Sequence, residues 1–516
     1  MTIMIMTDEL AKAREYEEEE GALVTDEERP VYHFSPRIGW LNDPNGLSFY
    51  GGKYHMFYQY YPYDSFWGPM HWGHAVSRDL INWEYLPCAL APDSDQDRMG
   101  CFSGSAVTTT DGMHLLIYTG CTEDKDDPDH RWKQSQCIAI GDGRDYVKLE
   151  NDPVISEDDL PEGGDPHEFR DPYIWKTGEG RYSALAANAN TGNGGITQLT
   201  IYKSDNARNW RRDSVLFEDK FKIGIMWECP NFFRSGSEYV LIASPMDMEA
   251  EEADGSIRFP KGNNVCYMLG GFDDESGKFR PYEDPLTGRY RYEPVDSGLD
   301  FYAPQVLQAP DGRNIMIGWM QDPQNAMKHD KSMKIFGQMT VPRELFTRSG
   351  KLCQRPVREI KTMRAERVEH KDVRVGSEEK SLDGVKGRSA ELIIRAGSEG
   401  DNYKELCIRF AKNDKYYTEL KYRPDQSIIT VDRTRSGQAG DIPAARTVRV
   451  RSRKGRITLR MLIDKWSTEV FINDGEQVMS LTYYTDPSAD DITFKADGNV
   501  KMDVTMYRLD PKKDRK

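Results

Sequence analysis

Residues 46–59 read GLSFYGGKYHMFYQ, two runs of apolar and aromatic residues on either side of the pair Gly51-Gly52. Tight hairpin turns select glycine because it adopts positive φ without steric cost. The stretch therefore predicts a β-hairpin whose two strands both carry large apolar side chains.

The same pattern occurs in four later stretches, each with a glycine at the expected turn. They are SAVTTTDGMHLLIYTG (105–120), DPYIWKTGEGRYSALAA (171–187), NFFRSGSEYVLIAS (231–244) and QVLQAPDGRNIMIGW (305–319). Roughly sixty to seventy-five residues separate the turn glycines, which leaves room for two more strands in each interval. These glycines are Gly52, Gly112, Gly178, Gly236 and Gly312. Five units of four strands predict a five-bladed β-propeller, with one large β-sandwich as the alternative.

A shorter repeat supports the propeller. SRDLINW (77–83) and SDNARNW (204–210) resemble one another and are expected to form the same turn between outer strands of two blades. From about residue 389 the pattern changes to alternating strands, and TEVFINDGEQVMSL (468–481) contains an Asn-Asp-Gly hairpin turn. Such alternation predicts an antiparallel β-sandwich.

We therefore expect an all-β chain in three parts. Residues 1–29 form an N-terminal extension, residues 30–350 a five-bladed β-propeller catalytic domain, and residues 351–516 a linker and a C-terminal β-sandwich. The acidic tract 17–20 is expected to form a solvated helix face or tail. A homo-oligomer would be expected to form through the sandwich.

Composition restricts the partners. The 516 residues carry a formal charge of −16, which argues against nucleic acid or an anionic membrane surface as the main partner. No apolar run approaches the ~18 residues of a spanning helix, and the N-terminus lacks the features of a signal peptide. The eight cysteines include no close pair of the kind found in metal or redox motifs, so we expect reduced, mostly buried thiols and a cytoplasmic protein. A neutral small molecule is the expected ligand.

Three acids lie at the starts of predicted hairpins, where the innermost strands of a propeller begin. Asp43 lies before the first hairpin, Asp171 begins the third and Glu228 precedes the fourth. Taken singly, Asp43 could simply belong to a tight turn, Asp171 to a surface ion pair with Arg170, and Glu228 to a blade edge. Together they predict the pair of carboxyl groups that glycoside hydrolysis requires, with a third to hold sugar hydroxyls.

The neighbouring residues are suited to a sugar. Aromatic faces pack on the C–H faces of a sugar ring, while amides and charged groups bind its hydroxyls. The predicted substrate-binding residues are Asn42, Gln59, Trp67, Phe102, Ser103, Arg170, Tyr302 and Trp319. Neither a cofactor nor a metal is expected. His71 and His74 in HWGH have no third ligand spaced beside them, so we interpret them as packing or hydrogen-bonding residues.

The ordered motifs WLNDPNG, FYQ, WG, FSGS, FRDP, WECP, FYAPQ and GWM, over roughly residues 30 to 345, resemble those of glycoside hydrolase family 32, the invertases and other β-fructosidases. EVFINDGE resembles a motif of that family's C-terminal sandwich. The resemblance implies a propeller with an appended sandwich and a retaining mechanism. It further implies that Asp43 is the nucleophile, Glu228 the acid/base, and Asp171 the residue that stabilises the transition state through fructose hydroxyls.

The implied chemistry sets further expectations. Glu228 should be protonated near neutral pH, because burial against Trp227 and the charges of Asp43 and Asp171 would raise its pKa. Cys229 is expected to be a small buried packing residue. The expected activity is hydrolysis of sucrose and short fructo-oligosaccharides as a β-fructofuranosidase of the invertase type. Sucrose-6-phosphate hydrolase and fructosyltransferase remain alternatives with the same intermediate. A binding module without catalysis and a five-bladed arabinofuranosidase-type enzyme are the more distant ones.

Overall fold

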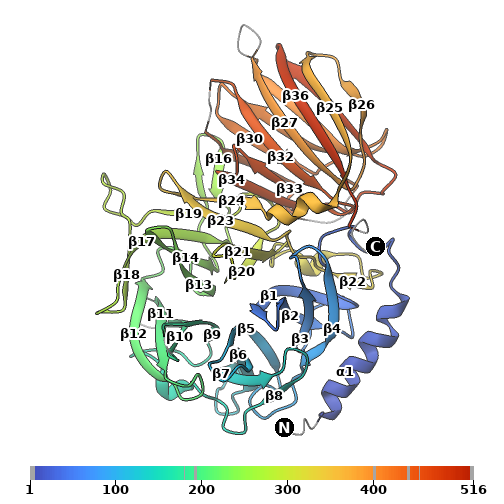
Figure 1. Cartoon of the computed structure of the whole chain (residues 1–516). Coiled ribbons are helices and arrows are strands. Elements are labelled where there is room, and N and C mark those ends of the chain that lie inside the picture. Colours follow the sequence, from blue (N-terminus) through green and yellow to red (C-terminus); the bar gives the residue numbers. More distant parts are fainter. Residues whose placement is uncertain are drawn as a thin grey trace.

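The computed structural model describes residues 6–178, 180–190, 195–398, 403–437, 442–451 and 454–511. Its strands form a ring of five sheets and, beside the ring, a stack of two larger sheets (Figure 1). The five-bladed propeller and the C-terminal sandwich predicted from the sequence are thus confirmed. Within the described residues, no helix is long and apolar enough to cross a membrane.

Each blade is an antiparallel sheet of four main strands whose first strand lies innermost. Blade 1 contains β1 (Gly39–Tyr50), β2 (Lys53–Tyr61), β3 (His71–Ser77) and β4 (Trp83–Leu90). Blade 2 contains β5 (Gly100–Thr108), β6 (His114–Glu123), β7 (Trp132–Gly141) and β8 (Tyr146–Lys148). Blade 3 contains β9 (Phe169–Lys176), β10 (Tyr182–Asn190), β11 (Ile196–Ser204) and β12 (Arg211–Asp219). Blade 4 contains β13 (Trp227–Ser235), β14 (Glu238–Pro245), β17 (Cys266–Asp273) and β18 (Lys278–Pro281), with β19 (Tyr292–Pro294) also paired to β17. Blade 5 contains β20 (Tyr302–Gln308), β21 (Asn314–Trp319), β23 (Arg343–Arg348) and β24 (Lys351–Pro356).

The five predicted hairpins are the two inner strands of the five blades. Their turn glycines all have positive φ, between +63° and +113°. At Gly52, Gly112, Gly178 and Gly312 a Cβ atom would meet nothing within 4 Å. The backbone conformation, rather than lack of space, therefore accounts for glycine at these turns.

The shorter repeat is also confirmed as one turn used twice. Asp79 Oδ1 accepts the backbone N–H groups of Ile81 and Asn82 between β3 and β4. Asn206 Oδ1 accepts those of Arg208 and Asn209 between β11 and β12. Side-chain oxygens of Asp and Asn stabilise turns in this way, which explains why the two segments are similar.

Blade 5 closes the ring onto blade 1. The loop between β21 and β23 contributes the two-residue strand β22 (Ile335–Phe336), which pairs in parallel with β1 at Gly39 and Trp40. The first and last blades are thereby linked by backbone hydrogen bonds.

Beside blade 4, β15 (Glu251–Ala253) and β16 (Ser256–Phe259) form a separate hairpin.

The sandwich consists of two six-stranded antiparallel sheets. One contains β25 (Arg364–Val375), β36 (Val500–Leu509), β27 (Ala390–Ser398), β32 (Ile457–Ile463), β33 (Ser467–Ile472) and β34 (Gln477–Thr482). The other contains β26 (Lys380–Lys386), β35 (Asp491–Asp497), β28 (Glu405–Lys412), β29 (Thr418–Arg423), β30 (Ile428–Asp432) and β31 (Ala445–Arg449). Because β24 is the outer strand of blade 5, the propeller extends past residue 350, the expected boundary, to Pro356.

The N-terminal extension is partly folded against blade 1. Helix α1 (Asp8–Glu19) lies beside β4 (Figure 1), and its Leu10 and Ala13 are buried in the propeller core. The expectation of a fully solvated acidic tract is wrong at Glu17, which faces the same way and is buried. Its carboxylate accepts the Cys88 backbone N–H at 2.7 Å, and burial raises its pKa to about 7.

A buried ionic network joins the two domains. Arg343 of β23 is fully buried and donates to Glu469 Oε2 of the sandwich at 2.7 Å and to Asp296 Oδ2 at 2.9 Å. His33 contacts Glu469 at 2.9 Å and Asp464 at 2.8 Å.

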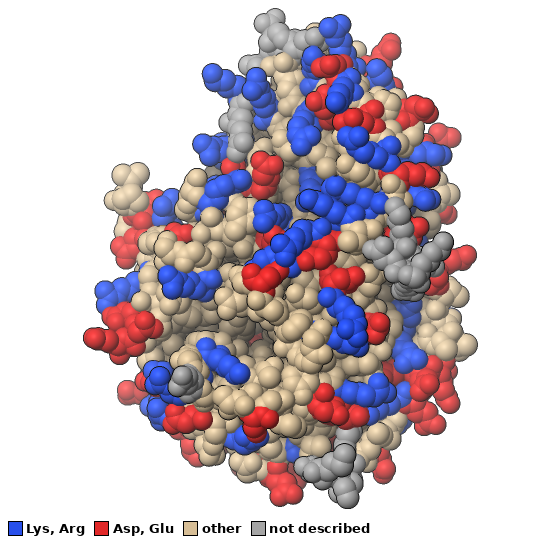
Figure 2. Space-filling view, in the orientation of Figure 1, with Lys and Arg blue, Asp and Glu red and all other residues tan. Residues whose placement is uncertain are grey.

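In Figure 2, Lys and Arg side chains gather where the sandwich meets the propeller, and the same face is hollowed near the middle of the ring.

Candidate active site

Every innermost strand shifts its register against the second strand at an equivalent place. Such β-bulges re-aim side chains at strand ends and next to active sites. Superposing the five bulges by sequence gives two rows of equivalent residues. The first row is Asn42, Phe102, Arg170, Glu228 and Tyr302, and the second is Asp43, Ser103, Asp171, Cys229 and Ala303. All three predicted acids thus belong to one ring of bulges.

The backbone is strained in three of these bulges. Asp171, Cys229 and Ala303 have φ of +62°, +48° and +45°, and each precedes a proline. Left-handed conformations of non-glycine residues cost about 1–3 kcal/mol each and persist where the surrounding structure enforces them. Proline suits the next position because a bulge leaves its missing N–H without a ladder partner.

Asp43 is held by three donors. Ser103 donates to its Oδ2 at 2.7 Å, Asn42 donates to its Oδ1 at 3.0 Å, and the Cys229 thiol lies 3.6 Å from Oδ2. Burial raises the pKa of Asp43, and these hydrogen bonds oppose the rise because they favour the carboxylate. Ser103 and Asn42 therefore orient an acid here, and their predicted contacts to sugar remain a prediction.

Cys229 connects two of the acids. Its backbone N–H donates to Asp171 Oδ2 at 2.9 Å, while its side chain reaches Asp43. Burial and the neighbouring carboxylates raise the pKa of the thiol well above its usual value, so it acts as a neutral donor. In the second row, Cys229 is followed by a proline, as are its equivalents in blades 1, 3 and 5. This pattern is the sequence signal that could have assigned Cys229 more than a packing role.

Glu228 has one partner on each oxygen. Tyr302 donates to Oε2 at 2.7 Å and Arg170 Nε donates to Oε1 at 3.2 Å. Burial raises its pKa and Asp43 adds to the effect, whereas Arg170 and Tyr302 oppose it. The pKa of Asp171 is likewise raised by burial and by Glu228. Close carboxyl groups that cannot all ionise are typical of acid/base catalysis.

Trp227 does not contribute to the burial of Glu228 as expected. Adjacent residues of a strand face opposite sides, and the Trp227 ring packs within the blade on Phe217 at 5.4 Å. Tyr302 also differs from its predicted use as a flat surface for sugar. Its ring is only 3% exposed, and its hydroxyl binds the acid.

An aromatic cluster lies next to this ring. Trp67, 39% exposed, stacks on Trp132 with ring centroids 6.2 Å apart, and Phe102 packs edge-on against both. Trp132 was missed in the sequence. The ring of Trp319 packs against Trp40, while Gln59 is buried and its amide donates to the Cys101 carbonyl.

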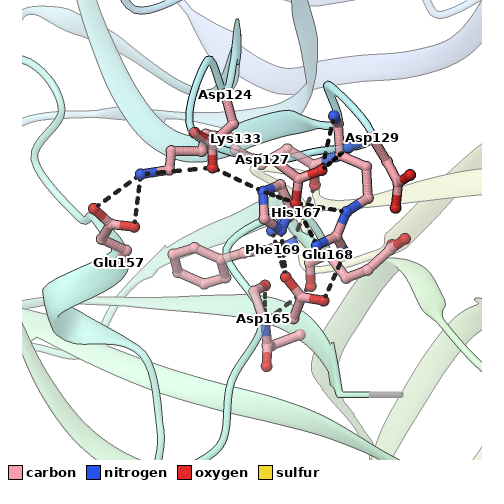
Figure 3. A network of polar contacts seen from close by, with 12 residues as sticks. Asp124, Asp127, Asp129, Lys133, Glu157, Asp165, His167, Glu168 and Phe169 are labelled. Atoms are coloured by element: carbon pink, nitrogen blue, oxygen red, sulfur yellow. Dashed lines mark hydrogen bonds and ion pairs between the residues drawn. The ribbon is translucent and has the colours of Figure 1, made fainter. Parts of the chain in front are cut away.

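A polar network surrounds His167, just before β9 (Figure 3), and the neighbouring Glu168 pairs with Arg170 at 2.7 Å. His167 contacts Asp124 at 3.1 Å and Asp165 at 2.7 Å, and Asp127 lies 3.7 Å away. Asp124, Asp127 and His167 are close enough to offer three ligand atoms to a metal ion. Arg131 also pairs with Asp127 at 2.6 Å, so positive side chains already neutralise these acids.

A third row of equivalent residues lies two positions after the second row, one on each innermost strand around the channel. It consists of Asn45, Ser105, Tyr173, Asn231 and Gln305. Gln305 accepts the Leu47 N–H at 2.6 Å and donates to the Gly104 carbonyl at 2.8 Å. Asn231 donates to the carbonyls of Cys229 and Pro304 at 2.9 and 2.8 Å. We call this row the polar plug; it ties the bulges of neighbouring blades together.

Both domains of the chain match models of one protein family. Residues 33–356 match the Glycosyl hydrolases family 32 N-terminal domain, and residues 359–508 match the C-terminal domain of that family. The chain belongs to glycoside hydrolase family 32. The N-terminal match ends at the last residue of β24, where the propeller ends.

Several family 32 relatives match over nearly the whole chain. The raffinose invertase of Escherichia coli is 34% identical over 89% of this chain and 90% of its own. The sucrose-6-phosphate hydrolase of Bacillus subtilis is 32% identical over 98% and 100%. The structure of the Bombyx mori beta-fructofuranosidase is 31% identical with a TM-score of 0.81, covering 98% of this chain and 99% of that one. The sucrose-6-phosphate hydrolase of Lactobacillus gasseri is 28% identical with a TM-score of 0.80 over 97% and 96%.

Proposed function

We propose that this protein is a retaining β-fructofuranosidase in which Asp43 is the nucleophile, Glu228 the acid/base and Asp171 the residue that holds fructose hydroxyls. The observation that carries the proposal is the ring of bulges, which positions three carboxyl groups from blades 1, 3 and 4, one buried and two half-buried, at one end of the channel. Their environments differ in the way that this chemistry requires.

The different environments support the division of roles. Asp43 accepts hydrogen bonds from Ser103, Asn42 and Cys229, which favour the ionised form that a nucleophile needs. Glu228 keeps a side-chain exposure of 23% and has its pKa raised by burial, as suits a group that must carry a proton to a ligand. Asp171 is fixed by the Cys229 N–H and interacts electrostatically with both Glu228 and Asp43.

In the first step, a carboxylate oxygen of Asp43 forms a bond to C2 of the fructosyl unit. The bond from C2 to the leaving oxygen breaks, and Glu228 gives its proton to that oxygen. In the second step, water attacks C2, Glu228 takes a proton from the water, and the bond to Asp43 breaks. Retaining enzymes hold such carboxyl pairs about 5–5.5 Å apart.

Replacing each acid by alanine tests the roles. Glu228→Ala should keep far more activity on an activated aryl β-fructofuranoside than on sucrose, because a good leaving group needs little protonation. Azide should accelerate this variant by attacking the fructosyl enzyme without base assistance. Asp43→Ala should show neither rescue. Equal losses of both variants on both substrates, with no response to azide, would refute the assignment.

For the substrate, we propose sucrose 6-phosphate, with sucrose as the second candidate. Relatives named sucrose-6-phosphate hydrolases in Escherichia coli, Bacillus subtilis and Lactobacillus gasseri support the first. The raffinose invertase and the silkworm beta-fructofuranosidase support the second. We expect kcat/KM to be at least about tenfold higher for sucrose 6-phosphate, equivalent to about 1.4 kcal/mol in the transition state. A higher value for sucrose would reject this substrate but leave the mechanism intact.

A further inference from the structure

A second cavity occupies the other end of the propeller channel. It has a volume of about 900 Å³ and is lined by three residues of the polar plug (Ser105, Tyr173 and Gln305), by the halves of the innermost strands that follow the plug, and by further strands of blades 3 and 4. None of the three acids borders it. Gln305, which bonds to both Leu47 and Gly104 across the channel, lies between this cavity and the bulges. A ligand in the cavity would therefore not touch the reacting groups.

One wall of the cavity is aromatic. Tyr173 and Trp175 of β9 have ring centroids 5.9 Å apart, and Trp175 approaches Phe232 of β13 at 6.4 Å. Phe232 in turn stacks on Tyr239 at 5.2 Å, and Phe272 packs against both. Trp175 and Tyr239 are only half-buried, so parts of their rings face the cavity. Flat, partly exposed rings of this kind suit the C–H faces of a sugar.

A buried amide supplies a hydrogen-bonding group. Asn314 is only 7% exposed and borders the cavity. Its Nδ2 donates to the Arg234 carbonyl at 2.9 Å, but its Oδ1 has no partner within the described residues. Buried polar atoms are nearly always hydrogen-bonded, which favours a donor such as a hydroxyl group at this acceptor. Because Oδ1 is itself buried, a ligand reaches it only if the cavity wall opens at Asn314.

The charge of the lining is positive in a chain that is strongly negative overall. Five Lys or Arg side chains border the cavity, against three aspartates. Two of the aspartates are engaged: Lys203 pairs with Asp213 at 2.9 Å, and Arg211 lies 3.9 Å from Asp205. Lys176 and Arg181, at the mouth, have no ion pair with a described residue. The excess of positive charge favours an anionic group on the ligand.

We propose that this cavity is a second binding site, specific for a phosphorylated saccharide. The sugar ring would pack on Trp175 and Tyr239, a hydroxyl would donate to Asn314 Oδ1, and the phosphate would lie between Lys176 and Arg181. The site binds without catalysis because it lacks the acids. Its existence does not depend on the proposed function, since the two sites share no side chain.

Isothermal titration of the full chain with glucose 6-phosphate tests the site. Two variants target the cavity: Trp175→Ala removes the sugar platform, and Lys176→Glu with Arg181→Glu reverses the charge at the exposed mouth. Each should weaken binding at least about tenfold. Both should leave kcat/KM on sucrose within about twofold of wild type. Trp67→Ala is the matched control, because it removes an exposed tryptophan beside the acids and should leave binding in the cavity unchanged.

Glucose and inorganic phosphate are titrated separately as the two component ligands. Each should bind at least about tenfold more weakly than glucose 6-phosphate, because each contacts only part of the site. Equal affinity of either one overturns the proposal of a phosphorylated saccharide. Unchanged affinity in both cavity variants, or loss of binding in Trp67→Ala alone, places the ligand elsewhere. No detectable binding of glucose 6-phosphate at about 10 mM also overturns the proposal.

Discussion

Replacing Tyr302 by phenylalanine should shift the pH dependence of the reaction toward higher pH. The Tyr302 hydroxyl donates to Glu228 Oε2 at 2.7 Å, and this bond favours the carboxylate over the protonated acid. Without it, Glu228 should retain its proton to higher pH. Because the first step uses the protonated form, the decrease of kcat/KM on the basic side should occur later.

The size of the shift follows from the contacts of the hydroxyl. A hydrogen bond to a charged group contributes about 1.5–3 kcal/mol, and about 1.4 kcal/mol corresponds to one pH unit. Tyr302 also lies 3.2 Å from the Ser244 carbonyl, which gives the hydroxyl another acceptor when Glu228 is protonated. Because the hydroxyl keeps this partner when Glu228 is protonated, the free energy by which it favours the ionised form lies at the lower end of the range of about 1.5–3 kcal/mol. The basic midpoint of the kcat/KM profile should therefore move up by about one pH unit.

The assay is the initial rate of fructose release at low substrate concentration across the pH range, with Tyr403→Phe as the control. Tyr403 is a buried tyrosine of the sandwich whose hydroxyl donates to the Gly455 carbonyl at 2.6 Å. The same atom is deleted there without contact to an acid, so its profile should match wild type. A basic midpoint that stays in place or moves down in Tyr302→Phe would refute the role given to this hydrogen bond.

Two further predictions concern the domain junction. Burial lowers the pKa of His33, but the hydrogen bonds that its ring nitrogens donate to Asp464 and Glu469 outweigh this effect and raise the pKa to about 9. The stability that the charged ring contributes, on the order of 3 kcal/mol, is fully present below the unfolded pKa of about 6.5 and is lost as pH rises through about 9. The difference in Tm between wild type and His33→Gln should shrink over that range, and a constant difference would contradict the assignment. Arg343→Met should lower the free energy of unfolding by about 3–5 kcal/mol, measured as a lower urea midpoint, because it leaves buried carboxylates unpaired. The control Arg358→Met removes exposed ion pairs and should lower it by less than about 1 kcal/mol. Equal losses of stability in the two variants would contradict the reasoning.

The inner hairpins and the positions of the acids could be predicted because their signals are local. Gly52 and its four equivalents adopt positive φ within a few residues of the strands that they join, and the repeat is visible along the chain. Once the repeat implies a propeller, residues at the strand starts must meet at one end of the channel. That rule places Asp43, Asp171 and Glu228 at this end, and the chemistry of glycoside hydrolysis together with the family 32 motifs distinguishes them from the other strand-start residues.

Other features depend on contacts between segments far apart in the chain. Cys229 contacts Asp43 across 186 residues, and Tyr302 binds Glu228 across 74. Which side chains meet at such separations depends on the bulges, since a shift of one residue turns a side chain to the other face of a strand. Trp227 therefore faces the blade core beside an acid that faces the channel. The burial of Glu17 also depends on a contact between distant segments. The sequence of α1 is typical of a solvated helix, and only the packing of α1 on β4 determines which glutamate of the helix faces the core.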